Sequence, residues 1–177
     1  MPPPSDESLL DSFRCGDQPA LGDLARRYER PLLGLATGLL DGRTDMASDA
    51  IQETWLRVIR FADKFDGRSS FKTWLYRIAI NQCRTIKSRS RPTADVSRGV
   101  PAPVSATPDD PDHLSWLRNQ VSLLSPDKRT VLLLCYHEGI THQLAAEILE
   151  VPLGTLKSRL HAALTTLRAA MAAEATP

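Results

Sequence analysis

The stretch from Gly67 to Ala94 combines residue types that suit contact with nucleic acid. It holds seven basic side chains and no acidic one. Cationic side chains bind a phosphate backbone, whereas amides and hydroxyls hydrogen-bond to bases. An ordinary solvated helix face is the alternative, but such a face mixes Glu with Lys, and this stretch has no acid. On a helical wheel of residues 71–91, one face carries Thr73, Arg77, Asn81, Arg84, Ser88 and Arg91, and the opposite face carries Phe71, Trp74, Leu75, Ile78 and Ile86.

The loop before this helix could hold an unstacked base. It reads Phe65-Asp66-Gly67-Arg68-Ser69-Ser70-Phe71, with an aromatic residue at each end and Arg and Ser between them. Single-stranded bases stack on aromatic rings and hydrogen-bond to nearby polar groups. Phe65 and Phe71 are at least as typical of a hydrophobic core, so both interpretations stay open here.

A second candidate surface lies on the helix expected from about Asp45 to Ala62. Its inward stripe contains Ile51, Trp55 and Val58. A leucine among acidic and amide groups on the outer face favours a protein contact, but single surface leucines are common, and the pattern does not decide. The outer face consists of Asp49, Gln52, Glu53, Leu56 and Arg60.

Residues 141–173 have the organisation of a helix-turn-helix. A short helix capped by Thr141 is followed by a turn at Glu150-Val151-Pro152 and by a longer helix from Leu153. In this motif the first residues of the second helix reach base edges in the major groove. An ordinary αα-hairpin is the alternative, but the short helix, tight turn and polar start favour DNA binding. The candidate contact residues are Thr155, Lys157, Ser158 and Arg159, and the packing stripe is Leu156, Leu160, Leu164, Leu167 and Met171.

These elements predict an all-α fold of two helical domains, the second a helix-turn-helix domain, joined by a flexible Pro-rich linker. No window alternates apolar and polar residues as a half-buried strand does. The linker is rich in proline and carries net charge −3. Further helices are expected from Asp17 towards Leu40, from Asp112 to Leu124 and from Pro126 to about His137. The predicted domains are 1–91, with net charge +3, and 113–177, with net charge +1, on either side of the linker 92–112.

Composition excludes several functional classes. The 177 residues contain no apolar run long enough to span a membrane, and the N-terminus lacks the features of a signal peptide, so a cytoplasmic protein is expected. The four histidines lack ligand spacing, and there is neither a phosphate-binding glycine loop nor a nucleophile motif, so no enzyme, metal site or cofactor is expected. Cys15, Cys83 and Cys135 form no disulfide framework and are expected to be buried small residues.

Four segments in this order resemble the extracytoplasmic-function (ECF) sigma factors of bacterial RNA polymerase. They begin at Asp49 (DAIQETWLRV), Phe71 (FKTWLYRIAINQCR), Leu124 (LSPDKR) and Val151 (VPLGTLKSRLH). The resemblance implies a promoter-recognition subunit that binds the clamp helices and flap of core RNA polymerase and promoter DNA, and that an anti-sigma factor can hold inactive.

The resemblance also implies roles for individual residues. Asp49, Gln52, Glu53 and Leu56 would grip the clamp helices. The melted −10 region would be bound by Arg68, Ser69, Ser70, Phe71, Tyr76, Arg77, Asn81 and Arg84. The −35 element would be read by Thr155, Lys157, Ser158 and Arg159, and the linker would thread through the polymerase.

The chain departs from the family pattern in its second domain. Glu150 stands where the family commonly has glycine, so it must tolerate an unfavourable backbone conformation or reshape the turn. Ala162 and Leu164 replace two usual arginines, and Leu144 and Ala145 replace an acidic residue and an isoleucine. Fewer phosphate contacts predict weak DNA binding by this domain alone.

Two other functions compete with the sigma-factor hypothesis. A helix-turn-helix repressor or activator would need only the second domain, and would leave the faces around Glu53 and Asn81 unexplained. A helical adaptor that has lost DNA binding would fit the few basic residues after Pro92.

Overall fold

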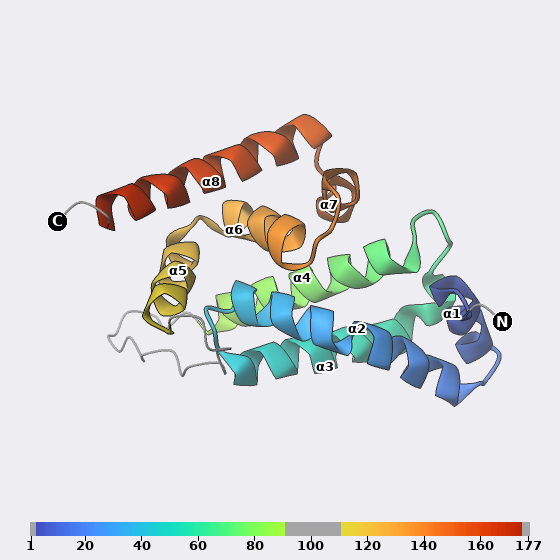
Figure 1. Cartoon of the computed structure of the whole chain (residues 1–177). Coiled ribbons are helices and arrows are strands. Elements are labelled where there is room, and N and C mark those ends of the chain that lie inside the picture. Colours follow the sequence, from blue (N-terminus) through green and yellow to red (C-terminus); the bar gives the residue numbers. More distant parts are fainter. Residues whose placement is uncertain (1–2, 91–110, 175–177) are drawn as a thin grey trace. The chain divides into compact units, whose positions relative to one another are not determined.

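A computed structural model describes residues 3–90 and 111–174, and in both ranges every regular element is helical (Figure 1). The predicted all-α class is therefore confirmed. Arg91 of the basic stripe and residues 92–110 of the predicted linker lie outside the described residues. The chain divides into two units: Met1–Ala36 with Asp45–Thr93, and Thr37–Thr44 with Ala94–Pro177.

The first unit is built on helices that begin where local capping favours them. Its elements are α1 (Asp6–Arg14), α2 (Gln18–Leu39, whose last turn falls in the second unit), α3 (Thr44–Phe61), the short 3-10 helix η1 (Ala62–Lys64) and α4 (Phe71–Arg89). Ser5 and Ser70 cap α1 and α4, because each hydroxyl accepts a hydrogen bond from the backbone N–H three residues later. The helix expected over residues 71–91 begins at Phe71 and ends at Arg89.

Buried side chains from α1, α2, α3 and α4 form the core of this unit. Leu10, Leu24, Leu32, Val58 and Leu75 have no exposed surface. Aromatic rings extend this core towards the start of α4: Tyr28 of α2 lies edge-on to both Phe71 and Tyr76, with ring centroids 5.9 and 6.4 Å apart.

The buried face of α4 is rotated about the helix axis relative to the face predicted from the helical wheel. Thr73, placed outward, is fully buried, and its hydroxyl lies 2.9 Å from that of Ser70. Trp74 and Ile78, placed inward, are only half-buried, whereas the polar Gln82 is buried. The hydrogen bond to Ser70 removes the cost of burying a hydroxyl, which a count of apolar residues does not anticipate.

The second unit contains the predicted helix-turn-helix. Its helices are α5 (Pro111–Leu123), α6 (Pro126–Leu132), α7 (His142–Leu149) and α8 (Leu153–Glu174). A π-helical turn, η2 (Leu133–His137), follows α6 within the segment predicted as one helix. Helix α8 packs against α5, α6 and α7. Thr141 caps α7 as predicted. Leu156, Leu160 and Leu167 are buried on α8, but Met171, predicted to pack, is 46% exposed.

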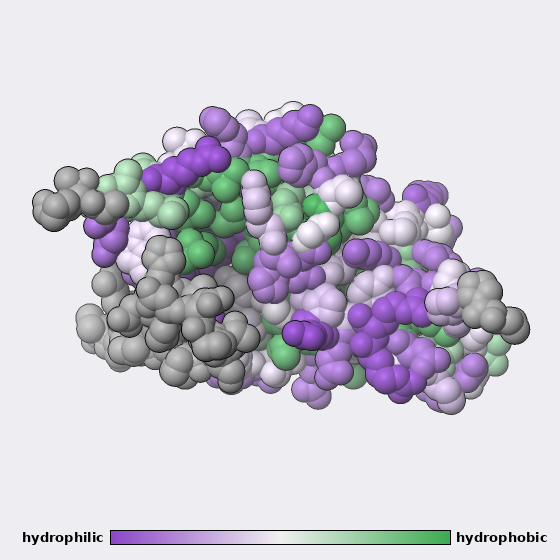
Figure 2. Space-filling view, in the orientation of Figure 1, coloured by the Kyte–Doolittle hydropathy of each residue, from purple (hydrophilic) through white to green (hydrophobic). Residues whose placement is uncertain are grey.

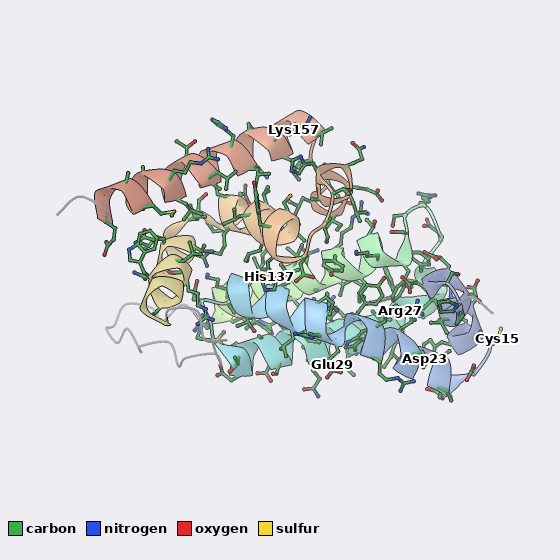
Figure 3. All side chains as sticks on the ribbon, viewed as in Figure 1. Cys15, Asp23, Arg27, Glu29, His137 and Lys157 are labelled. Atoms are coloured by element: carbon green, nitrogen blue, oxygen red, sulfur yellow. The ribbon has the colours of Figure 1, made fainter. Side chains whose placement is uncertain are left out.

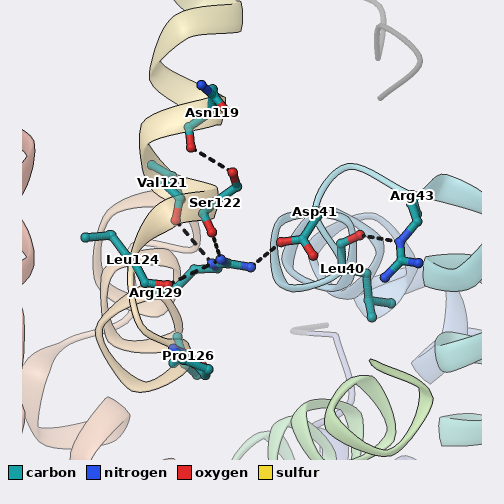
Figure 4. A network of polar contacts seen from close by, with 10 residues as sticks. Leu40, Asp41, Arg43, Asn119, Val121, Ser122, Leu124, Pro126 and Arg129 are labelled. Atoms are coloured by element: carbon teal, nitrogen blue, oxygen red, sulfur yellow. Dashed lines mark hydrogen bonds and ion pairs between the residues drawn. The ribbon is translucent and has the colours of Figure 1, made fainter. Parts of the chain in front are cut away.

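A buried arginine ties the parts of this unit together (Figure 4). Arg129 of α6 is 5% exposed, and its guanidinium donates to the carbonyls of Val121, Ser122 and Leu124 at the end of α5 and to the carboxylate of Asp41. The last carbonyls of a helix have no partner within it. Arg129 therefore satisfies the C-terminus of α5 and pairs its own charge at the same time.

The cysteines differ in exposure. Cys83 is buried, and burial raises the pKa of its thiol to about 12. Burial also raises the pKa of Cys135, which is half-buried. Cys15 follows α1 and is exposed, so the expectation that it is buried was wrong.

Candidate nucleic-acid and polymerase interfaces

The segment 62–70, called here the α3–α4 loop, presents polar groups to solvent. Gly67 has φ +72°, a conformation that L side chains rarely adopt, and this lets the chain reverse direction. Asp66 accepts a hydrogen bond from the Arg68 N–H at 3.1 Å and pairs with the Arg68 guanidinium at 3.0 Å. The Arg68 side chain is nevertheless 90% exposed, so it is accessible to a phosphate or a base.

An aromatic cluster lies beneath this loop. The Phe65 ring is centred 5.2 Å from that of Trp74 and 6.4 Å from that of Phe71. Phe71 is fully buried and Tyr76 is 2% exposed, so neither ring has surface for a base to stack on. Of the two interpretations left open for Phe71, the structure favours the core. Phe65 is only half-buried.

The exposed face of α4 carries Asn81 and Arg84, and both side chains are solvent-accessible. Arg77, one turn before Asn81, is half-buried. The ammonium of Lys72 lies 5.8 Å from the centre of the Tyr76 ring, which is a cation–π distance. The predicted −10 residues therefore fall into an accessible group on the loop and α4 and a buried pair, Phe71 and Tyr76.

The outer face of α3 is accessible over its whole predicted extent. Asp49, Gln52, Glu53 and Leu56 are all exposed, and Leu56 is 49% exposed. The structure adds Ile59, which is 48% exposed and lies three residues after Leu56 on the same side of the helix. Two accessible aliphatic side chains next to acidic groups suit a protein contact. The i, i+3 spacing of Leu56 and Ile59 was visible in the sequence, but the predicted outer face did not include Ile59.

The turn before α8 has the unfavourable backbone conformation that was one of the two predictions for Glu150. Glu150 adopts φ 54° and ψ 41°, in the left-handed region, so the turn is preserved without glycine. Its N–H and that of Val151 hydrogen-bond to carbonyls of α7, which is how a helix commonly ends. The turn therefore leads directly into α8.

The start of α8 presents the predicted base-contacting residues. Lys157 and Ser158 are exposed, Thr155 and Arg159 are half-buried, and Lys157 projects from the first turns of the helix (Figure 3). Hydrophilic residues prevail along the outer edge of α8 (Figure 2). The Arg159 guanidinium lies 2.8 Å from the Asp127 carboxylate of α6. A carboxylate from the neighbouring helix thus holds one of the two cations at this surface.

The described residues contain neither a cluster of metal-binding side chains nor a helix that could cross a membrane. No group of three or more His, Cys, Asp or Glu side chains in the ranges described could hold a metal ion. Among the same residues, no helix has the length and apolar character needed to cross a membrane.

Comparisons with known proteins cover nearly the whole chain. Residues 24–92 match the family Sigma-70 region 2, and residues 114–167 match Sigma-70, region 4. The chain is 30% identical to the ECF RNA polymerase sigma-E factor of Haemophilus influenzae, over 88% of this chain and 89% of the relative. It is 29% identical to the RNA polymerase sigma-H factor of Pseudomonas aeruginosa, over 88% of both chains.

A solved structure shows the same fold. The structure of CnrH in complex with the cytosolic domain of CnrY is similar with a TM-score of 0.76 and 25% identity, over 96% of this chain and 99% of that one. The match spans both helical units. The two predicted DNA-binding regions and the α3 face therefore lie in segments that these known proteins share.

Proposed function

Since the chain belongs to the extracytoplasmic-function sigma factors of bacterial RNA polymerase, which direct transcription initiation without being enzymes, we propose how its surfaces divide that work. Residues 1–91 bind the polymerase clamp helices and the −10 element. Residues 92–112 connect the domains, and residues 113–177 bind the −35 element and the flap. As a polymerase subunit, the protein acts in the cytoplasm.

The observation that carries the −10 assignment is the one-sided charge of the α3–α4 loop and α4. Arg68, Asn81 and Arg84 are accessible on elements without an acidic residue after Asp66. Cations there bind the phosphates of the displaced strand, and Ser69, Ser70 and Asn81 offer hydrogen bonds to bases. Phe71 and Tyr76 act from beneath as supports of the loop, because their rings are buried.

We assign polymerase binding to Asp49, Gln52, Glu53, Leu56 and Ile59 on α3. The aliphatic pair supplies apolar contact area, and the carboxylates attract basic groups on the partner and speed the encounter. We assign −35 recognition to Thr155, Lys157, Ser158 and Arg159, because the N-terminal residues of a recognition helix meet base edges in the major groove.

We also propose that an anti-sigma factor controls this chain. CnrH, which shares its fold over nearly the full length, was captured with the cytosolic domain of CnrY. An inhibitor that covers both domains would keep the surfaces on α3 and α4 from polymerase and DNA. Co-purification of the native protein would identify it.

Transcription in vitro tests the function directly. The protein is mixed with core polymerase and a library of promoter fragments, and the transcripts are sequenced. Transcripts that start downstream of a shared pair of −35 and −10 sequences are expected. Initiation no greater than with core polymerase alone would contradict the proposal, provided that the protein carries no bound inhibitor.

Single variants then separate the surfaces. Asn81→Ala and Arg77→Ala should abolish open-complex formation and leave polymerase binding intact, because both residues lie on α4 and outside the α3 face assigned to polymerase. Arg30→Ala on the exposed face of α2 is the matched control, since it removes one accessible cation outside the proposed surfaces. Loss of polymerase binding together with melting would mean that the α4 residues are structural.

A further inference from the structure

Helix α1 precedes the segment that matches sigma region 2, yet its polar contacts converge on the α3–α4 loop. Arg14, its last residue, donates from Nε to the Ala62 carbonyl at 2.9 Å and from Nη2 to the Phe65 carbonyl at 2.5 Å. The guanidinium carbon also lies 5.8 Å from the centre of the Phe65 ring. One side chain thus holds the start of the loop through two backbone carbonyls and an aromatic face.

Glu7, in the first turn of α1, holds the other end of the loop. Its Oε1 accepts a hydrogen bond from the Phe71 N–H at 2.9 Å. Phe71 is the first residue of α4, and the first N–H groups of a helix have no partner within it. A carboxylate is also favourable at this position, because the N-terminus of a helix carries partial positive charge. The loop is therefore attached to α1 where it begins and where it ends.

Helix α1 is itself fixed to α2, so it can serve as a support. Asp6 accepts a hydrogen bond from the Tyr28 hydroxyl and pairs with Arg27. Burial and the Asp6 carboxylate raise the pKa of Tyr28 well above its usual range, so the phenol stays protonated and donates. Leu9 and Leu10 are buried against the bundle.

We propose that α1 is a positioning element for −10 recognition, in which Arg14 and Glu7 hold the two ends of the α3–α4 loop in its DNA-binding conformation before DNA arrives. The inference rests on the proposed role of the loop. A loop that is already ordered loses less conformational entropy when it binds, and it therefore binds the melted strand more tightly. Neither residue needs to touch DNA, so both are positioning residues.

The test uses holoenzyme and a fluorescent single-stranded oligonucleotide that carries the non-template −10 sequence. Arg14→Ala should lower its affinity by about tenfold, since hydrogen bonds from a charged group are lost at the loop. Glu7→Gln should lower it less, because the amide oxygen can still accept from the Phe71 N–H. Arg14→Lys should behave nearly like Arg14→Ala, because an ammonium does not reproduce the geometry of two guanidinium donors. Core polymerase affinity should stay unchanged in all three variants.

Two controls keep the outcomes distinguishable. Asp11→Ala removes the exposed partner of Arg14 on α1 and none of the loop contacts, and should leave oligonucleotide affinity unchanged. Arg68→Ala tests the loop itself. Normal affinity in Arg14→Ala with reduced affinity in Arg68→Ala would overturn the role of α1 and leave the loop assignment standing. Normal affinity in both variants would contradict the loop assignment. Equal losses of oligonucleotide and polymerase binding in Arg14→Ala and Glu7→Gln would show that α1 merely maintains the fold.

Discussion

Glu150 shows how a single residue carries strain that the family usually avoids. Its left-handed backbone conformation costs an L residue about 1–2 kcal/mol. Glu150→Gly should therefore raise the free energy of unfolding by about 1 kcal/mol, after allowance for the greater freedom of glycine in the unfolded chain. Urea denaturation of the full chain measures this change.

The matched control for this variant is Glu147→Gly, three residues earlier. Glu147 is exposed and lies inside α7, where glycine lowers stability by about 1 kcal/mol. The two substitutions remove the same side chain and should shift stability in opposite directions. A loss of stability in Glu150→Gly would mean that contacts of the Glu150 side chain outweigh its backbone strain.

The cysteines should react with thiol reagents at very different rates. The thiolate is the form of cysteine that reacts. Cys83 is buried, and burial raises the pKa of its thiol to about 12, whereas Cys15 is exposed. A maleimide should therefore label Cys15 rapidly in the native protein and should label Cys83 only after the protein is unfolded. Mass spectrometry of peptides after a short pulse checks this order. Prompt labelling of Cys83 would show that the core around α4 opens readily.

The same pKa shift gives a pH dependence of stability. In the unfolded chain the Cys83 thiol titrates near its ordinary value of 9.0, whereas in the folded chain it holds its proton to about pH 12. Above pH 9 the unfolded state therefore binds fewer protons than the folded state. By linkage, stability should fall as the pH rises through this window, and Cys83→Ala should remove that part of the dependence.

At the scale of the element, the role of the outer face of α3 in polymerase binding can be tested separately from DNA binding. Glu53→Arg should weaken core polymerase binding, and Ile59→Asp should do so by at least about tenfold if Ile59 belongs to the centre of the contact. Glu29→Arg, an equal charge reversal on exposed α2, is the control. Fluorescence anisotropy with labelled protein measures the affinities. Unchanged binding in both α3 variants would remove this face from the proposal.

The end of α5 depends on one arginine. Arg129→Met would keep most of the side-chain volume but leave the Val121 and Ser122 carbonyls and the Asp41 carboxylate without their donor. Arg129 is buried, and a buried acceptor left without its hydrogen bond costs about 1–3 kcal/mol, so the thermal midpoint should drop strongly. Asp41→Asn should cost less, because its side chain is more accessible than that of Arg129. Equal effects would place most of the energy in the ion pair rather than in the cap of α5.

Local signals explain which elements were predictable. Ser70 and Thr141 cap their helices with their own hydroxyls, and Gly139 follows the preceding helical segment with φ +61°. These boundaries are therefore determined by residues that are adjacent in the sequence. The contacts of α1 are different, because Glu7 and Phe71 stand 64 positions apart. The burial of Thr73 and the π-helical turn η2 likewise depend on packing. The accessible site residues could be predicted from periodicity, but the support beneath them could not.

At the scale of the whole molecule, a net charge of +1 conceals an uneven distribution. On the α3–α4 loop and α4, the side chains of Lys64, Arg68, Arg84 and Arg89 are exposed. At the start of α8, one of two cations, Arg159, is paired with Asp127. The start of α8 therefore offers few basic side chains for contacts with DNA phosphates. We expect the free protein to bind a −35 duplex weakly and the holoenzyme to bind it tightly, because polymerase supplies the remaining contacts.

Restoring one cation tests this account. Ala162→Arg adds a basic residue where the family usually has one, and should steepen the salt dependence of −35 duplex binding by about 0.9 in the slope of log K against log salt, the value for one added phosphate contact. Ala169→Arg adds the same charge at an exposed position two turns further along α8. If the slope changes equally in both variants, the added charge acts through the overall field rather than at the recognition surface. If it changes only in Ala162→Arg, the scarcity of phosphate contacts at the start of α8 is what makes this unit depend on polymerase.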